Sequence, residues 1–205
     1  MKALSIFSLL VALITGSIPL HAEIKVLALS GSTRKDSYNK KLVSEAADLA
    51  KQLGAQVTVI DLKDYSSPFY DEDMETNEGM PPKAKELRRL LIQNQVILIA
   101  SPEYNGSLSA ILKNAIDWAS RSETGGPSRE AFKGKKFVLM STSPGPSGGM
   151  NGLKELRKIL ENVGGTVMSQ QLVIPDASHA FNQQGLKSSQ SKAELKNLIQ
   201  AALNP

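Results

Sequence analysis

The chain has 205 residues, of which 41% are hydrophobic and 21% charged, and this length and composition favour one domain with a well-buried core. The 24 Lys and Arg against 20 Asp and Glu give a formal charge of +4, but they are scattered, and no basic stripe with interleaved aromatic residues indicates nucleic-acid binding. Cysteine is absent, which excludes disulfides, thiol nucleophiles, thiolate metal sites and iron–sulfur clusters.

Residues 1–22 differ from everything that follows them. Lys2 precedes an apolar run from Ala3 to Ile14, and a tail containing Pro19 ends in the small residue Ala22. This order of parts is that of a secretory signal peptide, so we expect cleavage after Ala22 and export to the periplasm or the medium. Two alternatives stay open: an uncleaved anchor, for which the segment makes a poor spanning helix, and a cytoplasmic protein.

From Glu23 onward, strand and helix patterns alternate. Five apolar runs predict strands. They are Ile24 to Leu29, Gln56 to Asp61, Gln95 to Ala100, Lys136 to Thr142 and Thr166 to Ile174. Helices are predicted for Lys40 to Leu53, for a segment entered at Pro81 and Pro82, and for Leu108 to Ser120, Gly152 to Val163 and Lys192 to Leu203. The sequence therefore predicts one α/β domain over residues 23–205, with a five-stranded parallel sheet, right-handed crossovers and helices on both faces.

Polar residues outside these elements give no support to a metal site or a hydrolase. Tyr65 to Gly79 is polar and acidic, and we interpret Asp71 to Glu75 within it as a solvated charged loop, since no EF-hand spacing surrounds these residues. His179 is alone, without a second metal-ligand partner near it in the sequence. No G-x-S-x-G motif is present.

A hydroxyl-rich and basic loop follows the first predicted strand and leads into a helix. Ser32, Arg34, Ser37 and Asn39 can donate hydrogen bonds there, and the unpaired N–H groups of the helix start favour an anion. Gly31 leaves the backbone open to an approaching ligand. We expect a phosphate site, although an ordinary turn with Ser37 or Asn39 as the helix cap stays open. The loop matches neither G-x-G-x-x-G nor the P-loop.

Two further loops follow the third and fourth predicted strands, Ser101 to Gly106 and Ser143 to Gly149. Ligands of parallel α/β sheets bind beyond the carboxyl ends of the strands, where all three loops would lie. The second loop offers Tyr104 and the backbone amides of Asn105 and Gly106, while the third is so poor in side chains that a flat ring could lie against its backbone. Together the loops have the properties that a flavin requires.

Three motifs together resemble the NADPH-dependent FMN reductase family, which includes flavodoxin-like quinone, chromate and azo-dye reductases. They are L-S-G-S-x-R-x-x-S-x-N from Leu29, P-E-Y-N-G-S from Pro102 and L-K-N-A-x-D-W from Leu112. The resemblance spans Ile24 to about Leu203. It implies a flavodoxin-like three-layer sandwich, bound FMN, NADPH or NADH as electron donor, a small-molecule acceptor, and a homodimer or homotetramer that completes the flavin pocket.

By this resemblance the cofactor-binding positions fall on all three loops. The FMN phosphate falls on Ser32, Arg34, Ser37 and Asn39, the isoalloxazine ring on Pro102, Glu103, Tyr104, Asn105 and Gly106, and the third loop contributes Ser143 and Gly145 to Gly149, of which Gly145, Gly148 and Gly149 are singled out. Lys113, Asn114, Asp117 and Trp118 are expected to serve packing and subunit contacts.

The resulting hypothesis is an oxidoreductase that passes hydride from NADPH or NADH through bound FMN to an acceptor. The acceptor would be free flavin, a quinone, an azo compound or a metal oxyanion, and no catalytic side chain is required because the cofactor carries the chemistry. One alternative is a non-enzymatic FMN electron carrier, which the pI of about 9.2 disfavours because such carriers are typically acidic. Another is a binding module that has lost the flavin, which the intact Arg34, Ser37, Asn39 and Tyr104 disfavour.

Overall fold

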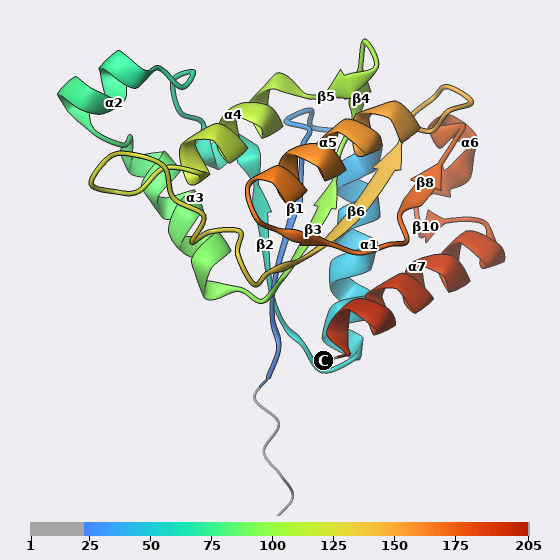
Figure 1. Cartoon of the computed structure of the whole chain (residues 1–205). Helices are drawn as coiled ribbons and strands as arrows, with labels where there is room; N and C mark the ends of the chain where they lie inside the picture. The colour runs from blue at the N-terminus through green and yellow to red at the C-terminus, as the bar shows by residue number, and fades with distance from the viewer. Residues whose placement is uncertain (1–22, 205) are drawn as a thin grey trace, which may run out of the picture.

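The computed structural model describes residues 23–204, so the expected signal peptide lies outside the described residues. A parallel sheet forms the centre of the domain (Figure 1). Its strands are β1 (Lys25–Ser30), β2 (Gln56–Asp61), β3 (Val96–Ala100), β6 (Lys136–Thr142), β7 (Thr166–Val167) and β8 (Leu172–Ile174). The order is β2-β1-β3-β6-β7, with β8 also paired to β6, and it corresponds to the flavodoxin-like order of a doubly wound sheet. The predicted α/β fold is confirmed.

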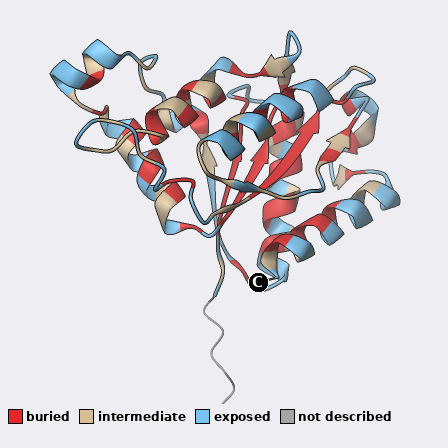
Figure 2. Ribbon diagram, viewed as in Figure 1, coloured by how far each residue is buried: buried red, intermediate tan, exposed pale blue. Residues whose placement is uncertain are grey.

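Helices cover both faces of this sheet. They are α1 (Tyr38–Gln52), α3 (Pro82–Gln93), α4 (Ala110–Ala119), α5 (Met150–Asn162) and α7 (Ser189–Leu203). Because successive strand residues point to opposite faces, Val26 and Ala28 of β1 pack with α1 and α7, whereas Leu27 and Leu29 pack with α3, α4 and α5. Figure 2 shows the central strands as almost wholly buried, which is why their sequences are continuous apolar runs.

The fifth strand is divided, in contrast to the single run predicted for Thr166 to Ile174. β7 pairs with the start of β6 and β8 with its end. Met168 N still donates to Phe137 O at 2.9 Å, and the ladder is interrupted at residues 169–171. The guanidinium of Arg157 in α5 donates hydrogen bonds to the carbonyl oxygens of Met168 (2.5 Å) and Ser169 (3.3 Å). At this point the Arg157 side chain, and not a neighbouring strand, donates the hydrogen bonds to the backbone carbonyl groups.

Several short elements were not predicted from the sequence. They are a 3-10 turn (Leu62–Tyr65), α2 (Glu72–Glu78), the hairpin of β4 (Glu103–Tyr104) and β5 (Ser107–Leu108), α6 (Ala177–Ala180), and the hairpin of β9 (Phe181–Asn182) and β10 (Gly185–Leu186). Within residues 23–204, no helix combines the length and the apolar character needed to span a membrane.

The acidic segment is a helix with a buried side, so its interpretation as a solvated loop was wrong. Asp71 caps α2 by accepting a hydrogen bond from Met74 N at 2.9 Å, and acidic residues in the first turn suit the positive end of the helix dipole. Glu75 is 6% exposed. Its carboxylate accepts hydrogen bonds from Arg121 Nε (2.9 and 3.0 Å) and from the Tyr70 hydroxyl (3.1 Å).

The segment that leads to α2 is anchored on α4, and α2 protrudes at the upper left of Figure 1. Asn114 Oδ1 accepts a hydrogen bond from Tyr70 N at 2.8 Å, and Asn114 Nδ2 and Trp118 Nε1 both donate to Pro68 O, at 2.9 and 2.8 Å. The indole and the Tyr70 ring meet edge to face with centroids 5.0 Å apart. Asn114 and Trp118 therefore serve packing, as predicted, whereas Lys113 and Asp117 pair with each other at 2.7 Å on the helix surface.

The Arg121–Glu75 pair gives a stability prediction. Hydrogen bonds from Arg121 hold the pKa of Glu75 below its usual range, so the stabilisation is present above the ordinary glutamate pKa of about 4.3 and is lost as the pH falls through the lowered pKa. Arg121→Met should lower the free energy of unfolding at pH 7 by about 3 kcal/mol, because Glu75 would keep a buried charge without a partner. Urea unfolding should find this difference shrinking as the pH falls below the ordinary glutamate pKa.

Arg89→Met is the matched control, because Arg89 pairs with Glu123 at 2.7 Å but lies largely in solvent. This variant should unfold much like the wild type. An equal loss in both variants would contradict a special role for the buried pair.

Candidate functional site

Three loops end neighbouring strands at one edge of the sheet. Loop 1 (residues 31–37) follows β1, loop 2 (residues 101–109) follows β3 and loop 3 (residues 143–149) follows β6. Strand pairing continues past the strand ends, since Gly31 N donates to Ala100 O and Ser101 N to Met140 O, both at 2.9 Å. The predicted common edge is therefore confirmed, and it lies at the top of the sheet in Figure 1.

Loop 1 places hydroxyl groups and a cation at the start of α1. Ser32 and Ser37 are buried. Ser32 Oγ accepts a hydrogen bond from Arg34 N at 3.4 Å, and Ser37 Oγ accepts one from Lys40 N, also at 3.4 Å. Ser37 is thus the helix cap, one of the two that the sequence allowed. Neither hydroxyl donates to an acceptor among the described residues, so both can donate to a ligand. Arg34 is exposed and forms no ion pair with any residue in the range 23–204.

Lys40, a cation in the first turn of α1, is already paired with a carboxylate. Its ammonium lies 2.5 Å from Asp61 Oδ2 at the end of β2. Burial raises the pKa of Asp61, but hydrogen bonds from Lys40 and from the Lys63 N–H outweigh it and hold this pKa below its ordinary value. Arg34 therefore remains as a free guanidinium of this loop.

Asn39 holds the protein together across the site. Its side chain is buried, its Nδ2 donates to Thr142 O at 2.9 Å, and its Oδ1 accepts from Thr142 N at 3.1 Å. The amide thereby ties α1 to the end of β6, where loop 3 begins. The sequence pattern placed Asn39 among the phosphate ligands and did not predict this clamp.

Loop 2 forms a two-residue hairpin that sequence reasoning missed. Asn105 and Gly106 have φ angles of 53° and 81°, as a type I′ turn requires, and the Asn-Gly dipeptide was the signal for it. Tyr104, on the first strand of the hairpin, is 51% exposed. Within residues 23–204 the N–H groups of Asn105 and Gly106 have no partner, so they are free to meet a ligand.

The other two residues predicted in loop 2 are engaged within the protein. Pro102 is buried against Gly31, where a Cβ in place of the glycine hydrogen would lie 3.2 Å from Pro102 Cδ and 3.0 Å from Leu112 Cδ2. Gly31 thus permits close packing of loop 1 on α4, which adds a reason for the glycine to the predicted one of ligand approach. Glu103 directs Oε2 at the first turn of α5 and accepts a hydrogen bond from Gly152 N at 2.9 Å.

Loop 3 depends on two glycines for its course. Gly148 and Gly149 have φ angles of 59° and 95°, and a Cβ at Gly149 would lie 1.9 Å from Ser141 Oγ. Ser143 O accepts from Ala177 N at 3.0 Å and Gly145 O from Gly148 N at 3.2 Å. The loop is thereby held while its backbone stays bare of bulky side chains, as the sequence indicated.

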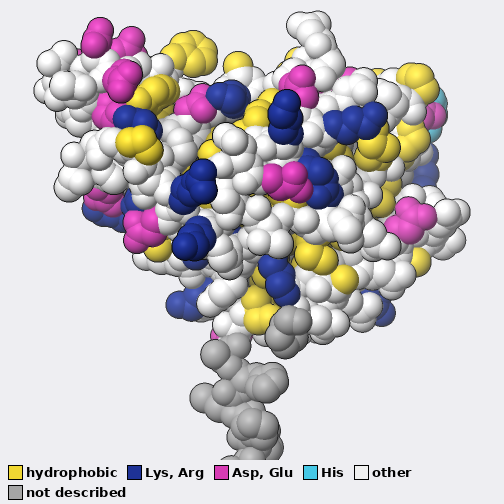
Figure 3. Space-filling model, viewed as in Figure 1, with side chains coloured by type: hydrophobic (Ala, Val, Ile, Leu, Met, Phe, Trp, Pro, Cys, Tyr) yellow, Lys and Arg dark blue, Asp and Glu magenta, His cyan; other side chains and the backbone are white. Residues whose placement is uncertain are grey.

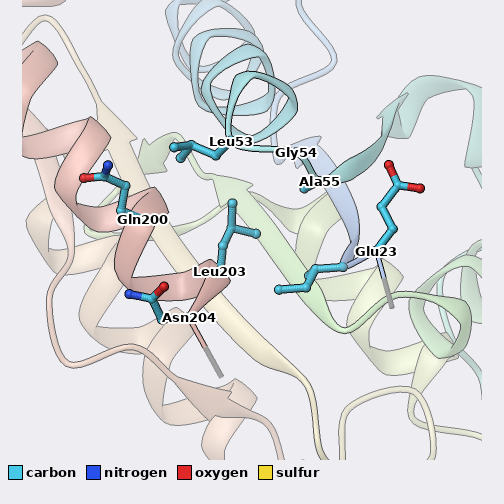
Figure 4. A pocket seen from close by; sticks show the side chains of 8 residues that line it. Glu23, Leu53, Gly54, Ala55, Gln200, Leu203 and Asn204 are labelled. Atoms are coloured by element: carbon cyan, nitrogen blue, oxygen red, sulfur yellow. The ribbon is translucent and has the colours of Figure 1, made fainter. Parts of the chain in front are cut away.

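A pocket lies at the opposite, amino-terminal edge of the sheet (Figure 4). This pocket of about 460 Å³ is formed where β1 begins, where α1 turns into β2 and where α7 ends. Leu53 and Leu203 line it, and Glu23 is the ionisable residue there, so it lacks a cation for a phosphate. Size alone therefore does not identify the functional site in this protein.

Among residues 23–204, no group of three or more His, Asp or Glu side chains could hold a metal ion. His179 is exposed and pairs through Nδ1 with Asp176 Oδ1 at 2.8 Å. The edge formed by the three loops instead offers a guanidinium, hydroxyls, a helix start and backbone N–H groups. Such donors suit a phosphate linked to a flat ring.

Comparisons with known proteins agree with this chemistry. The model of the family described as NADPH-dependent FMN reductase matches residues 24–179. An NAD(P)H-dependent FMN reductase of Pseudomonas aeruginosa is 35% identical over 164 residues, 80% of this chain and 84% of the relative. A quinone reductase of Escherichia coli is 31% identical over 150 residues, 72% and 74% of the two chains. FerB, a flavoenzyme NAD(P)H:(acceptor) oxidoreductase of Paracoccus denitrificans, superposes with a TM-score of 0.74 at 28% identity over 87% of this chain and 94% of its own.

Asn39→Ala tests whether the amide is a clamp. It should lower the free energy of unfolding of the flavin-free protein by about 2 kcal/mol, because two buried hydrogen bonds are lost and the Thr142 backbone is left unpaired. Thermal and urea unfolding without added flavin measure this loss. Ser32→Ala is the control, since Ser32 Oγ bonds only within its own loop in the described residues, and it should cost less. Unchanged stability of Asn39→Ala would leave a direct ligand role as the better explanation.

Proposed function

We propose, from the premise that this chain belongs to the NADPH-dependent FMN reductase family, that NAD(P)H and a small acceptor react in turn at one FMN held by loops 1, 2 and 3. The protein is an FMN-dependent NAD(P)H oxidoreductase. Its proposed acceptor is free flavin, a quinone, an azo compound or a metal oxyanion. The observation that carries the proposal is that three neighbouring strands end in donor-bearing loops at one edge, with Tyr104 left in solvent.

The residues of loop 1 fit a single terminal phosphate. Arg34 is the exposed guanidinium, and the N–H groups of Tyr38 and Asn39 at the start of α1 have no partner within residues 23–204. Near the same place Thr142 Oγ1 is buried and has no hydrogen-bond partner among the described residues. A cofactor with one phosphate, FMN and not FAD, suits this short loop, which has no dinucleotide fingerprint.

Loops 2 and 3 would orient the ring and stabilise charge on it. When bound, FMN supplies the chemistry of accepting and releasing hydride. The free N–H groups of Asn105 and Gly106 can donate to oxygen or nitrogen atoms at the ring edge. The start of α5 adds the positive end of a helix dipole beside loop 3, which favours negative charge on a reduced ring. No side-chain acid or nucleophile is assigned a catalytic role.

The protein is also proposed to form a homodimer or homotetramer. In support, Phe69 is 75% exposed although both of its neighbours, Pro68 and Tyr70, are fixed to α4. Figure 3 shows acidic side chains gathered on the protruding part that contains α2, while acidic and basic side chains mix on the remaining face. Ultracentrifugation should detect a dimer or larger assembly, which Phe69→Ser weakens. A monomer at all concentrations would rule out the assembly.

Export is proposed for the same chain, with residues 1–22 as a cleaved signal peptide and residues 23–205 as the exported domain. The support is the sequence order of one Lys, an apolar run and a tail ending in Ala22. Fractionation of the native host with intact-mass measurement should find a chain that begins at Glu23 outside the cytoplasm. Full-length protein in the cytoplasm would contradict export.

Kinetics and spectra together test the proposed function. Without oxygen, NADPH or NADH should bleach the visible flavin absorption of the full chain, and a quinone should restore it. Initial rates at several quinone concentrations should give parallel double-reciprocal lines, because donor and acceptor would share one site. Converging lines would indicate a separate acceptor pocket. A flavin that NAD(P)H does not bleach would instead favour the electron-carrier alternative.

Arg34→Ala tests the phosphate assignment. It should weaken FMN binding by about 1.5–3 kcal/mol, since a charge-assisted hydrogen bond would be lost. Fluorescence titration of the flavin-free protein measures the dissociation constant. Lys35→Ala is the matched control, because Lys35 is the neighbouring exposed cation. If both variants weaken binding equally, general attraction by positive charge explains the effect and the specific role of Arg34 is refuted.

A further inference from the structure

Helix α5 begins beside the proposed flavin site without a cap of its own. Its cap residue is Gly149, which has no side chain to accept a hydrogen bond, although the first N–H groups of any helix lack partners within the helix. The missing acceptor comes from loop 2. Glu103 Oε2 accepts from Gly152 N at 2.9 Å, across a separation of 49 residues.

The hairpin that carries Glu103 packs directly on this first turn. A Cβ at Gly152 would lie 3.2 Å from Ser107 O and 3.4 Å from Glu103 Cβ, so only a glycine allows the approach without displacement. Ser107 Oγ also donates a hydrogen bond to Glu155 Oε2, one turn further along α5. Close packing and two side-chain hydrogen bonds therefore hold the hairpin against the start of α5.

The charge of Glu103 has no cationic side chain to balance it. Among residues 23–204 it forms no ion pair with any Lys, Arg or His, and its partner is the helix start. A carboxylate is favourable there because the helix dipole is positive at this end. The same carboxylate opposes any other negative charge that develops nearby.

We propose that Glu103 is a positioning residue for the flavin site. Its carboxylate caps α5 across loop 3, fixes the N–H groups of Asn105 and Gly106 relative to that loop, and lowers the reduction potential of bound FMN through its negative charge. The proposal rests on the proposed function and goes beyond it, because it assigns Glu103 to the helix instead of to the ring and assigns a tuning role to its charge.

Glu103→Gln and Glu103→Ala separate the cap from the charge. The Gln amide oxygen can still accept from Gly152 N, so Glu103→Gln should keep the FMN dissociation constant within about twofold while the midpoint potential becomes more positive. Glu103→Ala removes both effects. In the flavin-free protein it should speed hydrogen exchange at Gly152 N by about tenfold or more, and it should weaken FMN binding by about tenfold.

Glu161→Gln is the control, because it removes one carboxylate charge at the end of α5 opposite to Gly152, where it contacts Arg157 and not loop 2. Its potential should equal that of the wild type. A potential in Glu103→Gln that also equals the wild-type value overturns the charge effect, and unchanged exchange at Gly152 in Glu103→Ala overturns the cap.

Failure of FMN binding and failure of the Glu103 cap give different results. If the wild type binds no FMN, the proposed function falls and the effect on potential falls with it. Exchange at Gly152 in the flavin-free chain still decides whether Glu103 caps α5. If Glu103→Ala does not fold while Glu103→Gln does, the cap is supported, since the Gln variant differs only in charge.

Discussion

The geometry of the site depends on side chains that each tie one loop to its neighbour. Ser109 Oγ, at the start of α4, donates to Gly31 O at 2.5 Å, and Ser141 Oγ donates to Ser101 O at 2.7 Å. Asn39 and Glu103 add the ties to the two ends of loop 3. Loops are ordinarily the most mobile parts of a domain, but buried side-chain bonds to backbone groups restrict these three. A flavin could then meet its donors without the entropic cost of ordering them.

The inner strands were predictable because burial on both faces leaves a continuous apolar run, as in β6, which begins and ends at the predicted residues. The edge strand β2 has no buried residue, and its β-branched side chains indicated the same bounds that the structure gives. What could not be predicted depends on contacts between distant segments. The gap between β7 and β8 follows from Arg157 of α5. The helical state of α2 follows from Glu75, which is buried only because Arg121 and Tyr70 receive it.

In the candidate site, too, the contacts between distant segments could not be predicted from the sequence. Residue types placed Arg34 and Tyr104 in loops at the carboxyl edge of the sheet, and both are exposed there. The same pattern also selected Asn39, Glu103 and Pro102, which the structure engages with the protein itself. A motif records which residues a site needs but does not separate ligand contacts from supports, because both kinds of residue recur at fixed spacing. Burial and hydrogen-bond partners make that separation.

The residues that support the loops and the residues that are exposed would contribute differently to the choice of acceptor. Groups committed to the scaffold, such as the Asn39 amide and the Glu103 carboxylate, have little freedom to adapt, whereas Tyr104 stands half in solvent at the rim. The backbone N–H groups of the three loops would hold the flavin in the same position for every acceptor, since they would contact the cofactor and not the substrate. Discrimination between acceptors would then depend on the few exposed side chains of the three loops, such as Tyr104, and on any neighbouring subunit. With so few contacts, differences in binding energy between acceptors would stay small, so we expect the proposed site to accept more than one class of acceptor.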